Sequence, residues 1–136
     1  MPSKVDEFLT EMLPRQIEAE RALCRGDNSA RTATWSQNDP VTLFGAAVPV
    51  RQGWASVDQT FQWLAGQFEG KPLLSYDLEL IAAGASGDLA YTVAFEHKSF
   101  EIDGQPEKCT LRVTHLYRRE AGEWRIVHRH GDYPPS

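Results

Sequence analysis

The stretch that decides the fold is residues 109–130, CTLRVTHLYRREAGEWRIVHRH. Two runs of residues that favour β-strands flank Glu120-Ala121-Gly122, a short polar turn that contains glycine, so the stretch predicts a β-hairpin. If the residues that flank this turn pair with each other, Arg112 lies opposite His130, and alternation places both on one face. That face is apolar near the turn and polar at its far end, as a small-molecule pocket requires.

The rest of the chain supplies helices first and strands after them. Apolar residues at helical spacing predict helices over residues 4–25, about 27–35 and 53–69. From residue 73 onward the pattern alternates with a period of two, interrupted by turn signals, which predicts consecutive antiparallel strands. This order predicts an α+β fold, a single domain over residues 1–136 in which the helices cover the apolar face of a curved antiparallel sheet.

The predicted turns also set the register of the strands and gather polar side chains at one end of the covered face. One row across the sheet is expected to contain Leu78, Phe95, Arg112 and His130. The neighbouring rows add Tyr76, His97, Thr114, His128 and Asp132. A charged Arg112 beneath helices needs a partner or an anionic ligand. His115 is expected on the opposite, outward face with Glu96 and Lys98.

Three of these residues are candidates for catalysis. His130 is a candidate for moving a proton, since histidine titrates near neutral pH. Arg112 is a candidate for stabilising a carboxylate or an oxyanion through its planar guanidinium. The alternative for Arg112 is a structural ion pair with Asp39 or Asp132. Asp132 either orients His130 or is an exposed carboxylate near the end of the chain.

The remaining candidates would bind the ligand: His128, Thr114, Tyr76, His97, Phe95, Trp35 and Asp39. For His128 the alternative is a core histidine, and for Trp35 and Tyr76 it is packing in the core. Asp39 would act as a base or as the partner of Arg112, or would serve the turn before Pro40. His97, His128 and His130 match no known ligand spacing, so no metal site is predicted. No glycine-rich nucleotide loop is present in the sequence, and no cofactor is expected.

The layout resembles that of the SnoaL-like members of the nuclear transport factor 2-like superfamily. The residues that carry the resemblance are Arg112-Val113-Thr114, the glycine-containing turn, the stretch from Trp124 to His130, and the helix opened by Gly53-Trp54. The ending Trp-x-x-Val-His-x-His is similar to the end of the association domain of calcium/calmodulin-dependent kinase II. That domain carries an arginine in the preceding strand, and Arg112 stands two residues earlier on the same face.

The resemblance implies a cone of the cystatin or nuclear transport factor 2 type, with a pocket between sheet and helices and homodimers through the outer face of the sheet. It does not imply one activity, because the superfamily includes isomerases, cyclases, dehydratases and non-enzymatic binding or assembly domains. Ketosteroid isomerases of this fold carry a catalytic aspartate late in a strand where this chain has Phe44 or Gly45. Asp39 falls too early, so their catalytic residues are not carried over.

Composition narrows the partners and the compartment. The net charge of −5 argues against broad binding of nucleic acids or anionic membranes. No apolar run approaches the ~20 residues of a membrane span, and the N-terminal residues do not form a secretory signal. Cys24 and Cys109 lie far apart and fit no metal spacing, which favours free thiols in a reducing cytoplasm.

Two functions are compatible with these observations. The first is a cofactor-free isomerase, cyclase or dehydratase acting on an apolar substrate that carries a carbonyl or carboxylate group. Arg112 would stabilise negative charge and His130 would transfer a proton, supported by Asp132 or Asp39. The second is a non-catalytic module that binds a small ligand or assembles as a dimer. A structural dimer whose pocket is filled by its own side chains is a third possibility.

Overall fold

The computed structural model describes residues 3–135 as three helices and six strands. The helices are α1 (Lys4–Cys24), α2 (Ser29–Thr34) and α3 (Trp54–Gln67). The strands are β1 (Thr42–Phe44), β2 (Arg51–Gln52), β3 (Leu73–Ser86), β4 (Leu89–Ile102), β5 (Gln105–Glu120) and β6 (Glu123–Asp132). They form one sheet in the order β2-β1-β6-β5-β4-β3. The β1–β6 pair is parallel, so the sheet is mixed, whereas the sequence predicted antiparallel pairing throughout.

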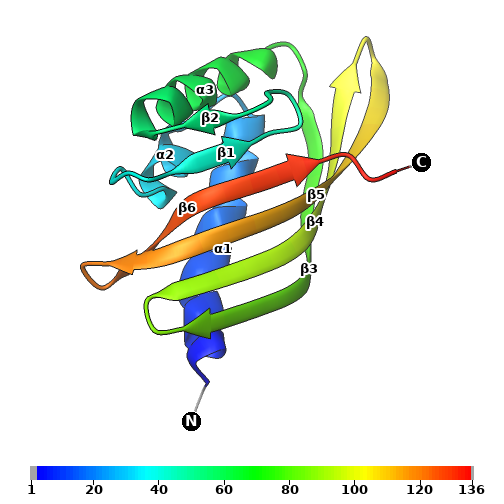
Figure 1. The fold of residues 1–136 in the computed structure, drawn as a ribbon. Helices are drawn as coiled ribbons and strands as arrows, with labels where there is room; N and C mark the ends of the chain where they lie inside the picture. Colours follow the sequence, from blue (N-terminus) through cyan, green and yellow to red (C-terminus); the bar gives the residue numbers. More distant parts are fainter. Residues whose placement is uncertain (1–2, 136) are drawn as a thin grey trace.

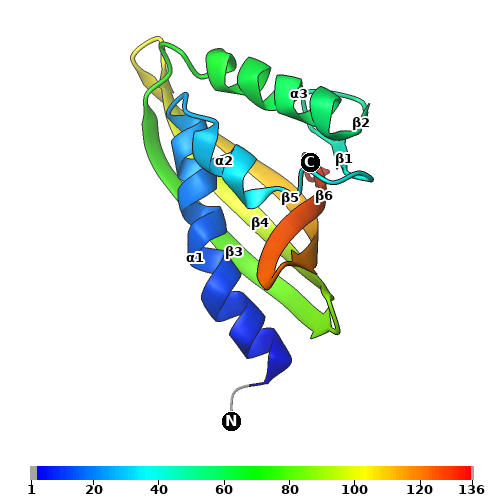
Figure 2. The ribbon, with the colours of Figure 1, turned by 90° about the vertical axis from the view of Figure 1, so that its left-hand side faces the viewer.

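The helices lie together on one side of the sheet. In Figure 1, α1 passes behind the long strands, and the view turned by 90° in Figure 2 shows all three helices on the same face. The sheet curls around them but does not close into a barrel. The predicted α+β cone, with N-terminal helices on a strongly curved sheet, is therefore confirmed. Within residues 3–135, no helix combines the length and the apolar character that crossing a bilayer demands.

The long helix α1 joins the helical layer to the sheet. It begins with a capping box, in which the Ser3 hydroxyl accepts from the Asp6 backbone N–H and the Asp6 carboxylate accepts from the Ser3 N–H. Its buried stripe includes Phe8, whose ring packs edge-on against Tyr117 and Trp124 at centroid distances of 4.7 and 5.1 Å. Such aromatic contacts add to the stabilisation that burial provides. They anchor α1 on β5 and β6.

The hairpin between β5 and β6 differs from the predicted one in two ways. The turn has two residues, Ala121 and Gly122, both with positive φ, and Glu120 pairs with Glu123. This is the geometry that matches the twist of paired strands. The register then shifts between Leu116 and Tyr117, so that Val127 is an extra residue in β6. A bulge of this kind exchanges the faces of all residues beyond it.

These two differences decide which side chains lie under the helices. The shorter turn places Tyr117, rather than Leu116, beside Ile126 on the covered face. The bulge then turns Arg129 inward and places His128 on the outer face. The register between β4 and β5 agrees with the prediction, including the pairs Phe95–Arg112, His97–Thr110, Val93–Thr114 and Tyr91–Leu116. The neighbours across β4 and β5 were therefore predicted correctly, and the face they occupy was predicted wrongly. The other two registers were also predicted wrongly, because Leu78 pairs with Glu96 instead of Phe95, and Arg112 pairs with Asp132 instead of His130.

Candidate ligand-binding site

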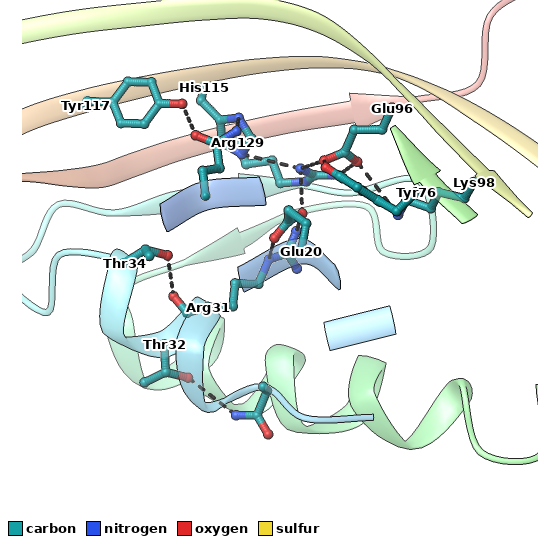
Figure 3. A network of polar contacts seen from close by, with 12 residues as sticks. Glu20, Arg31, Thr32, Thr34, Tyr76, Glu96, Lys98, His115, Tyr117 and Arg129 are labelled. Atoms are coloured by element: carbon teal, nitrogen blue, oxygen red, sulfur yellow. Dashed lines mark hydrogen bonds and ion pairs between the residues drawn. The ribbon is translucent and has the colours of Figure 1, made fainter. Parts of the chain in front are cut away.

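A buried ionic cluster connects the helices with the inner face of the sheet (Figure 3). Arg31 of α2 donates to both oxygens of Glu20 on α1, each at 2.8 Å. Arg129 of β6 donates to Glu20 at 3.0 Å and to both oxygens of Glu96 on β4, at 2.7 and 3.2 Å. Charge-assisted bonds of this kind are strong, and removing one partner would leave an uncompensated buried charge. The cluster therefore holds α1, α2, β4 and β6 together.

Tyr76 and His115 complete the hydrogen bonding of this cluster. The Tyr76 hydroxyl donates to Glu96 Oε2 at 2.7 Å. His115 Nε2 lies 3.3 Å from Arg129 Nη1, and its Nδ1 lies 3.1 Å from the amide of Gln16. Arg129 Nη1 and Gln16 Nε2 are both donors, so an imidazolium, with an N–H on each ring nitrogen, would face a donor at both positions and the neutral ring is favoured. Burial, together with the charge of Arg129, accordingly holds the pKa of His115 well below its usual range.

The charges of the cluster perturb one another in a consistent direction. Burial alone would raise the pKa of Glu96, but Arg129 and Lys98 outweigh it and hold that pKa well below its usual range. Burial likewise opposes the charged form of Arg129, and the two carboxylates Glu96 and Glu20 raise its pKa instead. Both groups of this pair are therefore charged, which matches their short hydrogen bonds.

A cavity of ≈ 150 Å³ lies between this cluster, α3 and the loop that follows β1. Its walls are mostly apolar: they include Leu43, Val48, Leu64, Phe68, Phe100 and Leu111. The rings of Phe68 and Phe100, which both line the cavity, are stacked at 5.2 Å. The charged side chains in the lining are Arg31, Lys98 and Arg129. An apolar chamber with a few convergent polar groups is the usual form of a small-molecule site.

Gly131 also lines this cavity, beside the side chain of Arg129. A Cβ atom at residue 131 would lie 3.4 Å from Arg129 Nη2 and 3.5 Å from its Nε, which is ordinary van der Waals contact. The backbone of β6 therefore packs directly against the guanidinium that binds Glu20 and Glu96.

The three residues predicted as catalytic lie on the other side of the sheet. Arg112 donates to both oxygens of Asp132, at 2.7 and 2.9 Å, and their side chains are 48% and 40% exposed. His130 Nε2 lies 3.9 Å from Asp132 Oδ2, beyond hydrogen-bond distance. The prediction that they face a pocket beneath the helices is wrong. The short turn and the Val127 bulge move these side chains from the covered face of the sheet to its outer face. The ion pair between Arg112 and Asp132, considered as an alternative, is present.

These residues line a shallow groove of ≈ 350 Å³ on the outer face, together with Phe95 and Thr114. The hydrogen bonds to Asp132 raise the pKa of Arg112, and the same contacts lower the pKa of Asp132. The structure therefore brings together five of the predicted site residues, but in an open groove. Their role in binding or catalysis stays a prediction.

The other predicted ligand-binding residues are divided between the two faces and the edge of the sheet. His128 and His97 lie on the outer face, where His128 Nδ1 contacts the Thr42 hydroxyl at 2.7 Å and His97 contacts Glu79 at 2.9 Å. Burial, and then His130, lower the pKa of His128. Tyr76 faces inward, as predicted, within the ionic cluster. Within residues 3–135, no group of three histidine, cysteine, aspartate or glutamate side chains is arranged to hold a metal ion.

Trp35 and Asp39 have structural environments. Trp35 is fully buried in the core and packs edge-on against Phe61 at 5.1 Å. Asp39 is exposed, and its carboxylate accepts from the backbone N–H of Trp54 at 2.8 Å. It thereby caps the first turn of α3, where a negative charge is favoured. Its partner is thus a helix terminus, whereas Arg112 is bound by Asp132.

The sequence interpretation missed the residues that do lie beneath the helices. His115, Glu96 and Lys98 were placed on the outer face, and the structure buries all three on the inner face. Glu20, Arg31 and Arg129 were not singled out at all. One signal was available: with a two-residue Ala121-Gly122 turn, the row Leu111, Val113, His115 and Tyr117 faces the helices. That row is more apolar than the alternative row of Arg112, Thr114, Leu116 and Arg118, so the alternation within β5 favours it.

A sequence model of the SnoaL-like domain matches residues 18–135, which is most of the chain. The protein belongs to the SnoaL-like family. No curated protein matches this SnoaL-like chain in sequence. Many solved structures do match in fold, and they include members of the nuclear transport factor 2-like superfamily, as the sequence predicted.

Three of these structures illustrate the range of the fold. A "putative dehydratase from the NTF2-like family" from Streptomyces avermitilis has a TM-score of 0.80 and 17% identity, over 96% of this chain and 99% of that one. A "putative calcium/calmodulin-dependent protein kinase type II association domain" from Thiobacillus denitrificans has a TM-score of 0.76 and 19% identity, over 92% of this chain and 96% of that one. A ketosteroid isomerase-like protein from Erwinia carotovora has a TM-score of 0.74 and 18% identity, over 96% of this chain and 99% of that one. At these identities the likeness establishes the fold of the SnoaL-like chain alone.

Proposed function

We propose that this SnoaL-like protein binds a small molecule in the cavity between α3 and the inner face of the sheet. The ligand has an apolar body and a carbonyl or carboxylate group. The observation that carries the proposal is the composition of the cavity, which has apolar walls and three cationic side chains, Arg31, Lys98 and Arg129. Cationic groups in a poorly hydrated chamber attract negative charge or a carbonyl dipole more strongly than they would in water.

Binding is favoured over catalysis within this cavity. Among residues 3–135, no side chain that lines it is a carboxylate or an imidazole, the groups that most often transfer protons in enzymes. Glu20, Glu96 and His115 are close, but their hydrogen bonds are directed into the ionic cluster. An isomerase, cyclase or dehydratase reaction of the kind inferred from the sequence would need a general base at the ligand. The proposal is therefore a ligand-binding protein first and an enzyme second.

The experiment that tests binding uses simple ring compounds, because a cavity of this volume holds a benzene-sized ligand in other proteins. Benzoate and benzamide are titrated into the isotopically labelled protein, and amide shifts of the cavity residues are followed by NMR. Leu64→Trp fills the cavity from α3, and Gln62→Trp adds the same side chain at an exposed position of that helix. We expect binding to the wild type and to Gln62→Trp but not to Leu64→Trp. Equal behaviour of all three proteins would disprove the proposed site.

We also propose that two copies of the chain pair through the outer face of the sheet. Large apolar side chains are exposed there: Phe44, Ile81, Tyr91 and Leu116 are between 41% and 54% accessible. Tyr91 and Leu116 are cross-strand partners, and Leu116 lies beside His128, so the apolar residues are continuous with the polar groove. Apolar patches of this kind on a small domain usually mark an interface. The groove lined by Arg112, His130 and Asp132 would then lie within the contact between two copies.

A further inference from the structure

Lys98 carries the one cationic group of the buried cluster that has no hydrogen-bonded partner among residues 3–135. Its side chain is 8% exposed, and Nζ lies 3.7 Å from Glu96 Oε1, beyond hydrogen-bond distance. We propose that Lys98 is the anion-recognition residue of the cavity, and that the ligand is a small monocarboxylate with a ring-sized or short apolar body. This inference rests on the proposed function and narrows it from a carbonyl or carboxylate to an anion.

The charge count of the cluster supports an anionic ligand. Three cations, Arg31, Lys98 and Arg129, are buried with two carboxylates, Glu20 and Glu96. His115 adds no further positive charge, since its contacts with Arg129 and Gln16 favour the neutral ring. The cavity is therefore adjacent to a cluster with one positive charge in excess, and a monoanion would make it neutral.

The carboxylates of the cluster are also saturated by other donors. Glu20 accepts three hydrogen bonds from Arg31 and Arg129. Glu96 accepts two from Arg129 and one from Tyr76. Arg31 Nε and Nη2 and Arg129 Nη1 and Nη2 thus donate within the cluster. The ammonium of Lys98 lines the cavity and makes no hydrogen bond among residues 3–135, so an anion in the cavity would supply the hydrogen bonds that this largely buried group lacks.

The neighbourhood of Lys98 indicates how the apolar part of the ligand lies. Lys98 shares the inner face of β4 with Phe100 and pairs across the sheet with Cys109, and all three residues line the cavity. A carboxylate on Lys98 thus places the body of its ligand beside the stacked rings of Phe68 and Phe100. Aromatic walls favour a planar or ring-shaped body. Benzoate combines both features, and benzamide is its neutral counterpart of the same shape.

The test compares the affinities of benzoate and benzamide for three proteins by calorimetry or NMR titration. The proteins are the wild type, Lys98→Met, and the control Lys108→Met, which removes an exposed lysine from β5. We expect the wild type to bind benzoate about tenfold or more tightly than benzamide, since hydrogen bonds to charged groups are the stronger ones. The ratio falls to about one in Lys98→Met, while benzamide still binds, and Lys108→Met keeps the wild-type ratio.

The outcomes separate this inference from the proposed function. Equal binding of the two compounds to the wild type overturns the anion preference and leaves the cavity as a binding site. A preference for benzoate that survives in Lys98→Met overturns the role of Lys98. Failure of both compounds to bind defeats the proposed function itself and the inference with it.

A second measurement needs no ligand. Lys98→Met removes an ammonium that lies 3.7 Å from Glu96 without a hydrogen bond, and it leaves two arginines buried with two carboxylates. Because Glu96 keeps its hydrogen bonds from Arg129 and Tyr76, the free variant should unfold at no lower a temperature than the wild type. A clear fall in the unfolding temperature would show that Lys98 serves as the ion-pair partner of Glu96, and would overturn the proposal.

Discussion

The two faces of β4, β5 and β6 carry the same kinds of side chain in different surroundings. Beneath the helices, Arg129 is bound by Glu96 and Glu20 and contacts His115. On the outer face, Arg112 is bound by Asp132, with His130 nearby. The inner set is almost fully buried, whereas the outer set is about half exposed. The comparison shows that the face of the sheet on which a side chain lies, and not its residue type, decides whether an arginine or histidine stabilises the fold or remains available at the surface.

The largest difference between the two faces should appear in stability. Arg129→Met leaves Glu96 buried with only Tyr76 as a close donor, so the free energy of unfolding should fall by about 3–5 kcal/mol. Arg112→Met removes an exposed ion pair and should leave that free energy unchanged within error. Urea unfolding followed by circular dichroism measures both. Equal losses would show that the outer arginine is as important to the fold as the inner one.

The outer face should instead control assembly. Leu116→Arg places a charge within the exposed apolar patch, and we expect it to weaken the dimer by about 2 kcal/mol or more, as at a well-packed interface. Light scattering over a range of protein concentrations gives the dissociation constant, and circular dichroism checks that the fold is retained. The control is Trp63→Arg on α3, which replaces an apolar residue of similar exposure on the helical side. A wild-type protein that is monomeric at high concentration would disprove the proposed interface.

The two histidine environments should differ in their response to pH. The pKa of His115 is well below 6.5 in the folded protein and returns to about 6.5 on unfolding, so the unfolded chain binds a proton that the folded one does not. The free energy of unfolding contributed by His115 is therefore complete above pH 6.5. It falls by up to about 1.4 kcal/mol per pH unit below that value.

Comparison with His115→Gln isolates this contribution. Between pH 6.5 and 4.5, the variant should lose less stability than the wild type as the pH falls. The comparison stops near pH 4.5, the usual pKa of a glutamate. Below that pH the unfolded chain protonates Glu96 while the folded protein, in which its pKa is lowered, does not, so both proteins lose stability for this second reason. Parallel stability curves for the two proteins would mean that His115 is protonated in the folded state.

The smallest expected change in the free energy of unfolding concerns the turn between β5 and β6, which sets the register of these two strands. Ala121 has a φ of 50° in the two-residue turn, a conformation that asparagine tolerates better than alanine. Ala121→Asn should therefore raise the free energy of unfolding by up to about 1 kcal/mol. Gly122→Ala, at a φ of 81°, should lower it. A three-residue turn of the kind first inferred from the sequence would also place Gly122 at positive φ but not Ala121. An unchanged free energy of unfolding in Ala121→Asn would therefore contradict the two-residue turn.

The fold was predictable because its signals are redundant. Helical spacing in α1 and α3, alternation in the long strands and the glycine-containing turns all indicate the same α+β arrangement. The candidate site was less predictable, because one residue more or less in a turn or a bulge exchanges the side chains on the two faces of a strand. In β5 the row with Leu116 also contains Arg112, Thr114 and Arg118, whereas the row with Tyr117 contains Leu111, Val113 and His115, and a turn one residue shorter selects the second. The bulge at Val127 has no local sequence signature, because its neighbours are ordinary strand residues.

The bulge at Val127 has a consequence for comparing members of this family. Two relatives that differ by one residue at this point can keep the same ladder of backbone contacts while presenting His128 and His130, or Arg129 and Gly131, to the helices. Matching columns of their sequences would then equate a residue of the interior with one on the surface. Transfer of functional residues along this last strand therefore needs superimposed coordinates, even where letters such as Val-His-x-His coincide.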